Sequence, residues 1–184
     1  DVCSSDLNGP GGPHLALVGL MGAGKSEVGA AVAQRRSLRH LDLDVLVTGR
    51  EGRSVGVLFE EQGESGFRDC EQAALADVLS LVQPVVLSTG GGVLERLPNR
   101  ELLSERATVV WLRARPETLA ERVGDGVGRP LLQAGNPAEV LAELSTRRGS
   151  DYEAAADHVV DTDDMTVDEV ADTVVAALPD PVTT

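Results

Sequence analysis

The stretch LALVGLMGAGKS, residues 15–26, decides the fold. It opens with an apolar run that is short enough for a buried strand, and it ends in the phosphate-loop pattern G-x-x-x-x-G-K-[ST]. An alanine-rich segment with helical character follows. Glycines let successive backbone N–H groups turn toward one anion, and the N-terminus of the following helix adds its dipole. The stretch therefore predicts a nucleotide-phosphate site. The alternative is a plain glycine-rich turn, and the agreement of motif and context argues against it.

Two side chains of this pattern supply chemistry. Lys25 is long enough to reach the β- and γ-phosphates of a nucleotide, and Ser26 can place its hydroxyl on Mg²⁺. Lys25 is also the only lysine in the chain, whereas arginine is common. The pattern thus indicates binding of a nucleoside triphosphate together with Mg²⁺.

Length and composition indicate one α/β domain in the cytoplasm. The 184 residues are 42% hydrophobic and only 2% aromatic, so the core must be built from Val, Leu and Ala. The formal net charge of -14 argues against nucleic acid as a partner, because such binding needs a basic surface. No apolar run approaches the roughly 18 residues of a membrane span. Cys3 and Cys70 give no disulfide framework.

Periodicity and capping signals predict a three-layer α/β/α fold of the P-loop NTPase type with a five-stranded parallel sheet. Strands are expected at 14–19, 40–44, 85–87, 108–112 and 158–161. Helices are expected at 25–36, 55–62, 66–81, 98–103, 116–122, 137–154 and 167–178. We expect residues 1–13 to be a disordered leader, 14–178 to form the single domain, and 179–184 to be a frayed tail. The glycine-rich segment 123–136 is expected to be a mobile lid, with a plain surface loop as the alternative.

Two acids stand at the predicted end of the second strand. Asp42 and Asp44 alternate, so they share one face if the strand continues through both. Ligands of doubly wound folds bind beyond the carboxyl ends of the strands, where the phosphate loop also lies. The acids could therefore serve Mg²⁺ and a substrate hydroxyl, with solvated strand-end acids as the alternative. The strand at 85–87 does not end in Asp, which leaves Asp42 as the better metal candidate.

Two other features have both structural and functional interpretations. Arg68 could be a surface arginine or an i,i+3 partner of Glu71. Gly90, Gly91 and Gly92 could form a plain loop, or could bring backbone N–H groups close to a ligand.

The motifs occur in an order that resembles the shikimate kinase family, small P-loop kinases of the nucleoside-monophosphate-kinase-like group. After the phosphate loop come Asp-x-Asp at 42–44, Phe-Arg-x-x-Glu at 67–71, three glycines at 90–92, Arg-Pro-Leu-Leu at 129–132 and Arg-x-x-x-Tyr at 148–152. The resemblance covers about residues 14–177. Each later motif is weak alone, but their order and spacing together are more specific than the phosphate loop, which many NTPases share.

The resemblance implies roles for individual residues. It implies that ATP is bound by Gly22, Ala23, Gly24, Lys25, Ser26, Glu27, Arg122, Arg129 and Met165. It implies that Mg²⁺ is held by Ser26 and Asp42. It implies that the substrate is bound by Asp44, Arg68, Gly90, Gly91, Gly92 and Arg148. It implies catalytic roles for Lys25, Asp44 and Arg129, the last from the lid.

The function implied is transfer of the ATP γ-phosphoryl group to the 3-hydroxyl of shikimate by a cytoplasmic monomer, giving 3-phosphoshikimate and ADP. A gluconate-type kinase and a non-catalytic P-loop nucleotide-binding protein are the alternatives. Met165 and Val167 stand where the family often has Arg and Pro, which leaves the nucleotide base preference open. The segment 149–151 lacks a common proline, so either Arg147 or Arg148 could be the second substrate arginine.

Overall fold

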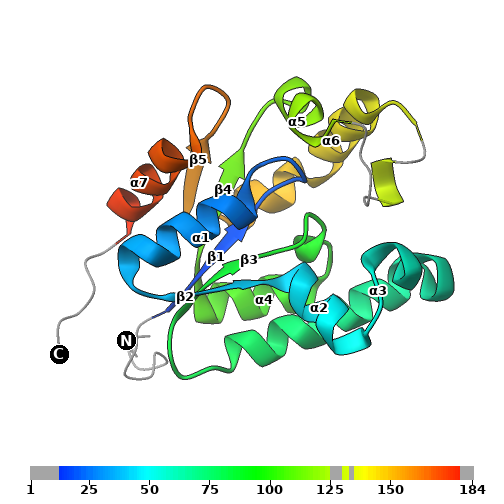
Figure 1. The fold of residues 1–184 in the computed structure, drawn as a ribbon, viewed down its shortest axis with the longest axis horizontal. Helices are drawn as coiled ribbons and strands as arrows, with labels where there is room; N and C mark the ends of the chain where they lie inside the picture. Colours follow the sequence, from blue (N-terminus) through cyan, green and yellow to red (C-terminus); the bar gives the residue numbers. More distant parts are fainter. Residues whose placement is uncertain (1–12, 125–129, 133–134, 179–184) are drawn as a thin grey trace.

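The computed structural model describes residues 13–124, 130–132 and 135–178. Its centre is a five-stranded parallel sheet with the strand order β2-β3-β1-β4-β5. The strands are β1 (His14–Val18), β2 (Arg39–Asp42), β3 (Val85–Ser88), β4 (Ala107–Arg113) and β5 (His158–Asp161). The phosphate loop follows β1, the central strand, and therefore leaves the sheet between β3 and β4 (Figure 1).

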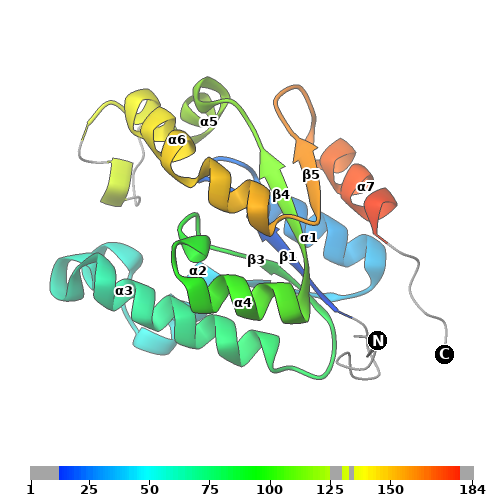
Figure 2. The same ribbon diagram turned by 180° about the vertical axis from the view of Figure 1, so that it is seen from behind.

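Helices cover both faces of the sheet and make the three layers that the sequence predicts. On one face, α1 (Lys25–Arg36) packs against α7 (Val167–Ala177). On the other face lie α4 (Leu97–Arg106), α6 (Pro137–Ala155) and the C-terminal part of α3 (Val55–Leu79), as Figure 2 shows. The remaining elements are α2 (Leu43–Glu51), α5 (Pro116–Val123) and two short 3-10 helices, η1 (Val93–Glu95) and η2 (Pro130–Leu132).

Aliphatic side chains build the core, as the low aromatic content requires. Strands β1 and β3 are buried along their whole length. Parallel strands that are covered on both faces are continuous apolar runs for this reason. Burying each Leu or Val side chain contributes about 1.5–3 kcal/mol. Among the described Phe, Tyr and Trp residues, only Phe67 and Tyr152 are buried. Phe67 lines the cavity described below, and the Tyr152 hydroxyl bonds to Gly91 of the same cavity.

The expectation that Asp42 and Asp44 share one strand is wrong. Strand β2 ends at Asp42, and Asp44 lies in the first turn of α2, a helix that the sequence analysis did not predict. Asp42 is the N-cap of this helix, because its Oδ1 accepts hydrogen bonds from the backbone N–H groups of Asp44 at 3.0 Å and Val45 at 3.3 Å. N-capping by a carboxylate competes with continuation of the strand, and at Asp42 the cap forms and the helix begins.

The two helices expected at 55–62 and 66–81 are both present, joined across a break within the element α3. Gly63 breaks the helical backbone with φ 69° and ψ 179°. Ser54 caps the start as predicted, accepting from the N–H of Val57 at 3.3 Å. The break falls at Gly63 rather than at a cap on Ser65, because the left-handed φ suits a residue without Cβ.

Several predictions fall on residues outside the described part of the chain. They are the leader up to residue 12, the tail at 179–184, and the lid segments 125–129 and 133–134, which include Arg129. The leader, the tail and the lid therefore stay predictions. Among the helices of the described residues, none combines the length and apolar character needed to cross a membrane.

Candidate active site

A cavity of about 770 Å³ lies beyond the carboxyl ends of the strands. It brings together all the predicted site residues that the structure describes. Its lining includes Gly22, Ala23, Gly24, Lys25, Ser26, Glu27, Asp42, Asp44, Arg68, Gly90, Gly91, Gly92, Arg122, Arg148 and Met165. These residues come from seven separate parts of the sequence, so their convergence is a property of the fold.

The phosphate loop has the backbone that an anion site needs. Gly22 and Gly24 both have φ of 84°, a left-handed conformation that favours glycine. A Cβ on Gly22 would also lie 2.8 Å from the carbonyl oxygen of Leu119. The Lys25 ammonium donates to the carbonyl oxygens of Gly19 at 2.8 Å and Leu20 at 3.0 Å, which holds it over the loop. Helix α1 begins at Lys25, so the N–H groups of its first turn point toward the same anion site.

Ser26 and Asp42 meet at the start of α1. The Ser26 hydroxyl donates to Oδ2 of Asp42 at 2.5 Å. Mg²⁺ beside a nucleotide is bound by oxygen ligands, and a hydroxyl and a carboxylate that lie side by side provide such ligands. The donor set therefore fits the metal that the sequence implies.

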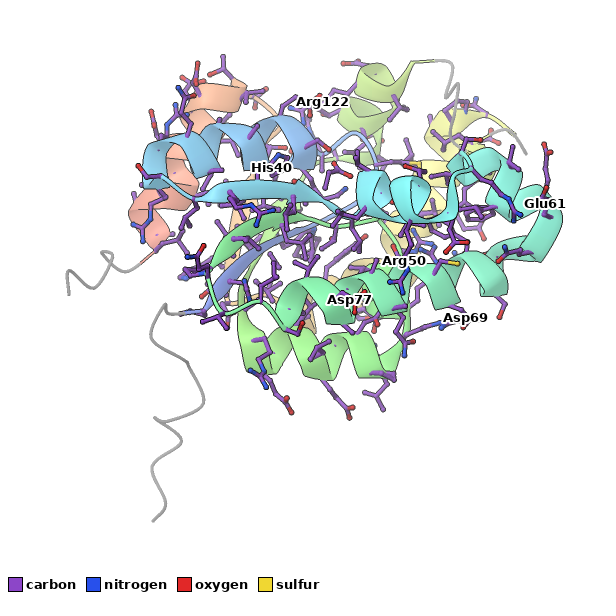
Figure 3. All side chains as sticks on the ribbon, turned by 60° about the horizontal axis from the view of Figure 1, so that its bottom comes forward. His40, Arg50, Glu61, Asp69, Asp77 and Arg122 are labelled. Carbon is purple, nitrogen blue, oxygen red and sulfur yellow. The ribbon has the colours of Figure 1, made fainter. Side chains whose placement is uncertain are left out.

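Ser88 is the last residue of β3, a strand that does not end in an acid. It contacts the start of α1, where the phosphate loop passes into the helix. Its hydroxyl donates to the backbone carbonyl of Lys25 at 2.7 Å and lies 2.9 Å from Nε2 of His40, which Figure 3 labels on β2. Because the single hydroxyl proton is used on Lys25, His40 is the donor in the second contact. Burial lowers the pKa of His40 and so favours the neutral imidazole. In this form Nε2 carries the proton that is donated to Ser88. Sequence reasoning did not find this chain of contacts.

Arg68 is buried in the cavity wall, with 6% of its surface exposed. Its Nη1 donates to Oε2 of Glu71 at 2.8 Å, so the i,i+3 partnership left open by the sequence is present. Its Nη2 donates to Oε1 of Glu64 at 3.1 Å. The guanidinium packs against Gly92, where a Cβ would be only 2.1 Å from Nη2. Glycine at this position therefore makes room for the arginine.

Glu71 is a site residue that sequence reasoning named only as a partner of Arg68. It is fully buried, and this burial raises the pKa of its carboxyl although the charge of Arg68 opposes the shift. Its Oε1 has no hydrogen-bond partner among the described residues and points toward Gly90, where a Cβ would lie 2.2 Å away. Asp44 faces the same glycine, with Oδ1 3.3 Å from that Cβ position. The spacing of the Phe-Arg-x-x-Glu motif is the sequence feature that could have identified Glu71 as a site residue.

Arg148, and not Arg147, lines the cavity. Arg148 has 2% of its surface exposed, whereas the Arg147 side chain is 55% exposed. Nη1 of Arg148 donates to the carbonyl oxygen of Gly91 at 3.1 Å, and the Tyr152 hydroxyl donates to the same oxygen. Burial raises the pKa of Tyr152, so this hydroxyl keeps its proton.

Arg68 and Arg148 also share one property. Nε of Arg68 and Nη2 of Arg148 are buried and make no well-aligned hydrogen bond among the described residues, although they lie 3.6 Å and 2.7 Å from the two carboxylate oxygens of Glu95. Two buried guanidinium groups that line one cavity indicate a place for an anion there. A carboxylate suits such planar donors because each oxygen can accept from one arginine.

The opposite end of the cavity is half apolar. Met165, Val167 and Val170 line it together with Arg122, the residue that Figure 3 labels on α5. Nη1 of Arg122 donates to the hydroxyl of Thr162 at 3.0 Å, which ties α5 to the loop after β5. An arginine plane and apolar side chains can together hold a flat aromatic base.

Several known proteins of similar sequence are shikimate kinases. The family model described as "Shikimate kinase" matches residues 21–179. The shikimate kinase of Vibrio vulnificus is 42% identical over 165 residues, which cover 90% of this chain and 95% of that protein. The shikimate kinase of Chromohalobacter salexigens is 44% identical over 151 residues, covering 82% and 83%.

Solved structures agree with this result. Shikimate kinase from Acinetobacter baumannii in complex with shikimate superposes with a TM-score of 0.85 at 35% identity, covering 88% of this chain and 90% of that one. A gluconokinase from Sinorhizobium meliloti has a TM-score of 0.56 at 20% identity, which shows a shared fold alone. The expected P-loop fold is confirmed, and so is the family over its gluconate-type alternative. The chain is an ATP-dependent kinase that belongs to the shikimate kinase family.

Proposed function

We propose that this cavity transfers the γ-phosphoryl group of ATP to the 3-hydroxyl of shikimate, giving 3-phosphoshikimate and ADP, with the phosphate loop at one end and Arg68 and Arg148 at the other. The observation that carries the proposal is the pair of buried guanidinium groups, Arg68 and Arg148, that line the same cavity as the phosphate loop. A gluconate-type acceptor is also an anion, so the acceptor itself must be tested.

At the phosphate end, the backbone N–H groups of the loop receive the ATP phosphates. These N–H groups belong to Gly22, Ala23, Gly24, Lys25, Ser26 and Glu27. The Lys25 ammonium exchanges its contacts with loop carbonyls for the β- and γ-phosphates. Ser26 and Asp42 would hold Mg²⁺, which neutralises phosphate charge when it is bound. Phosphoryl transfer depends on such positioning and neutralisation more than on covalent catalysis.

At the acceptor end, Arg68 and Arg148 bind the carboxylate of shikimate. Gly90, Gly91 and Gly92 let the ring approach the backbone closely. Asp44 binds the acceptor hydroxyl groups and accepts the proton of the attacking one. Its position in the first turn of α2, next to Gly90, supports this role.

The remaining assignments concern the nucleotide base and the whole molecule. Arg122 and Met165 hold the adenine, and Arg129 reaches the transferred phosphoryl group from the lid. We also propose that the chain acts as a monomer in the cytoplasm, without nucleic acid or membrane partners. The net charge of -14 supports the absence of nucleic acid.

The test is ADP release from Mg²⁺-ATP with shikimate, quinate, gluconate or no acceptor. Turnover that depends on shikimate and exceeds all other acceptors is expected. Turnover with gluconate alone would contradict the assignment of the acceptor while keeping the nucleotide site.

Arg147 and Arg148 are a matched pair for the carboxylate assignment. Because charge-assisted hydrogen bonds contribute about 1.5–3 kcal/mol, Arg148→Ala should raise the shikimate KM on the order of 10–100-fold. Arg147→Ala removes the same charge one residue away and should change that KM by less than about threefold, since its side chain is half exposed.

A further inference from the structure

Glu95 contacts both of the arginines that are proposed to bind the substrate. It is the last residue of η1, three positions after Gly92. Nε of Arg148 donates to Oε1 of Glu95 at 2.7 Å. Nε of Arg68 lies 3.6 Å from Oε2 of the same carboxylate. One oxygen of Glu95 therefore faces each arginine of the pair.

Glu95 reaches the pair from outside the cavity. Arg68 and Arg148 both line the cavity, whereas Glu95 is absent from its lining among the described residues. The Glu95 side chain is 29% exposed, and the exposed Arg147 contacts it from the solvent side, with Nη2 3.5 Å from Oε1. Both guanidinium groups therefore pair with Glu95 while still lining the cavity, where a second anion can reach them.

The two arginines differ in how their charges are balanced. Arg68 has the carboxylates of Glu71 and Glu64 within ion-pair distance, in addition to Glu95. For Arg148, Glu95 is the only carboxylate within 4 Å in the part of the chain that the structure describes. A buried charge without a partner is strongly unfavourable, and two like charges that converge also repel each other. Glu95 therefore supplies the charge that lets Arg148 stay buried beside Arg68.

We propose that Glu95 is a positioning residue for substrate binding. It holds Arg148 against Arg68 in the orientation that receives the substrate carboxylate, and it connects η1, α3 and α6 through one side chain. This inference rests on the proposed function, because it assumes that the arginine pair binds the carboxylate of shikimate. Without Glu95, the substrate would have to bring the two guanidinium groups together itself, which lowers its apparent affinity.

The test is the kinetics of Glu95→Ala and Glu95→Gln with shikimate and ATP varied separately. Losing one charge-assisted hydrogen bond should raise the shikimate KM of Glu95→Ala about tenfold. We expect kcat and the ATP KM to change less than about twofold, because the phosphate loop is untouched. Glu95→Gln keeps an oxygen for Arg148 but cannot face both arginines with oxygens, so it should recover part of the loss. Glu101→Ala, which removes one exposed acid on α4, is the control and should behave as the unmodified chain.

The outcomes separate the inference from the proposed function. A shikimate KM in Glu95→Ala that is unchanged or lower overturns the inference, and a lower KM would mean that the Glu95 carboxylate competes with the substrate. If Arg148→Ala raises the KM in the same series, the proposed function still stands. If the unmodified chain shows no turnover that depends on shikimate, both fail. Should Glu95→Ala melt too early to assay, Glu95→Gln decides: a selective rise in shikimate KM supports positioning, and a loss of melting temperature without that rise contradicts it.

Discussion

The Ser26 hydroxyl and the Asp42 carboxylate are joined by a 2.5 Å hydrogen bond between the start of α1 and the end of β2. Oδ2 of Asp42 accepts this bond, while Oδ1 caps α2 by accepting from the N–H groups of Asp44 and Val45. One carboxylate thus connects the phosphate loop to the helix that carries the proposed base. This single side chain therefore sets the spacing between the proposed metal ligands and Asp44.

Asp42→Asn should separate the capping role of Asp42 from its proposed metal role. Asparagine caps helices as well as aspartate, so the stability of the variant should stay near that of the unmodified chain. The lost charge should raise the Mg²⁺ concentration for half-maximal turnover about tenfold or more. Asp42→Ala should in addition lose about 1 kcal/mol of unfolding free energy with the cap. Titration of turnover with Mg²⁺ and urea unfolding measure the two effects, and an unchanged Mg²⁺ dependence in Asp42→Asn would refute the metal assignment.

Asp44→Asn tests the proposed base. The substitution is nearly isosteric, so the fold should be retained, while kcat should fall about 10²-fold or more because a general base contributes that much. Steady-state kinetics with both substrates saturating give the answer. A near-normal kcat would show that Asp44 is not needed to accept the proton.

Gly92→Ala should damage shikimate binding selectively. Its Cβ would lie 2.1 Å from Nη2 of Arg68, so the guanidinium must move, although the backbone φ of -111° tolerates alanine. We expect the shikimate KM to rise about tenfold with little change in the ATP KM. Gly149→Ala is the control, because this helical glycine follows Arg148 and has open space around its Cβ position. That variant should keep normal kinetics and gain about 0.5–1 kcal/mol of stability. Equal kinetics of the two variants would contradict the close packing of Arg68 on Gly92.

Burial of Glu71 predicts a pH dependence of stability. Its pKa is raised in the folded chain, so the unfolded chain loses this proton first as the pH rises. The contribution of Glu71 to stability is therefore fully present below the ordinary glutamate pKa of about 4.3 and is lost as the pH rises through the raised value. Glu71→Gln has no proton to lose at this position. Urea unfolding of both proteins between about pH 4.5 and 7.5 should show the variant gaining stability relative to the unmodified chain as the pH rises. A constant or falling difference would mean that Glu71 is ionised throughout.

The phosphate loop and the strand order could be predicted because the signals are local. Gly22 and Gly24 are required by the left-handed backbone of the loop, and the short apolar runs become fully buried parallel strands. Asp44 was predicted on the second strand but lies in α2, and the reason is equally local. Strand alternation and N-capping make opposite predictions for Asp44, and the two hydrogen bonds to Asp42 decide for the helix.

The roles of Glu71 and Glu95 depend on tertiary contacts, which a single sequence does not display. Glu71 shows its spacing to Arg68 in the sequence, but its complete burial follows only from the packing of α3 against the glycine loop. Glu95 lies 53 residues before Arg148, and nothing in the spacing connects them. The choice between Arg147 and Arg148 likewise needed the rotation of α6, which turns Arg148 toward Gly91.

The most direct test of the central claim is the preference for a charged acceptor. We would measure kcat/KM for shikimate and for its uncharged methyl ester, in the unmodified chain and in Arg148→Ala. The unmodified chain should prefer shikimate by a factor on the order of 10–100, because only the free carboxylate can accept charge-assisted bonds from both arginines. Arg148→Ala should lose most of that preference. The same preference in both proteins would contradict the assignment of the arginine pair to the substrate carboxylate.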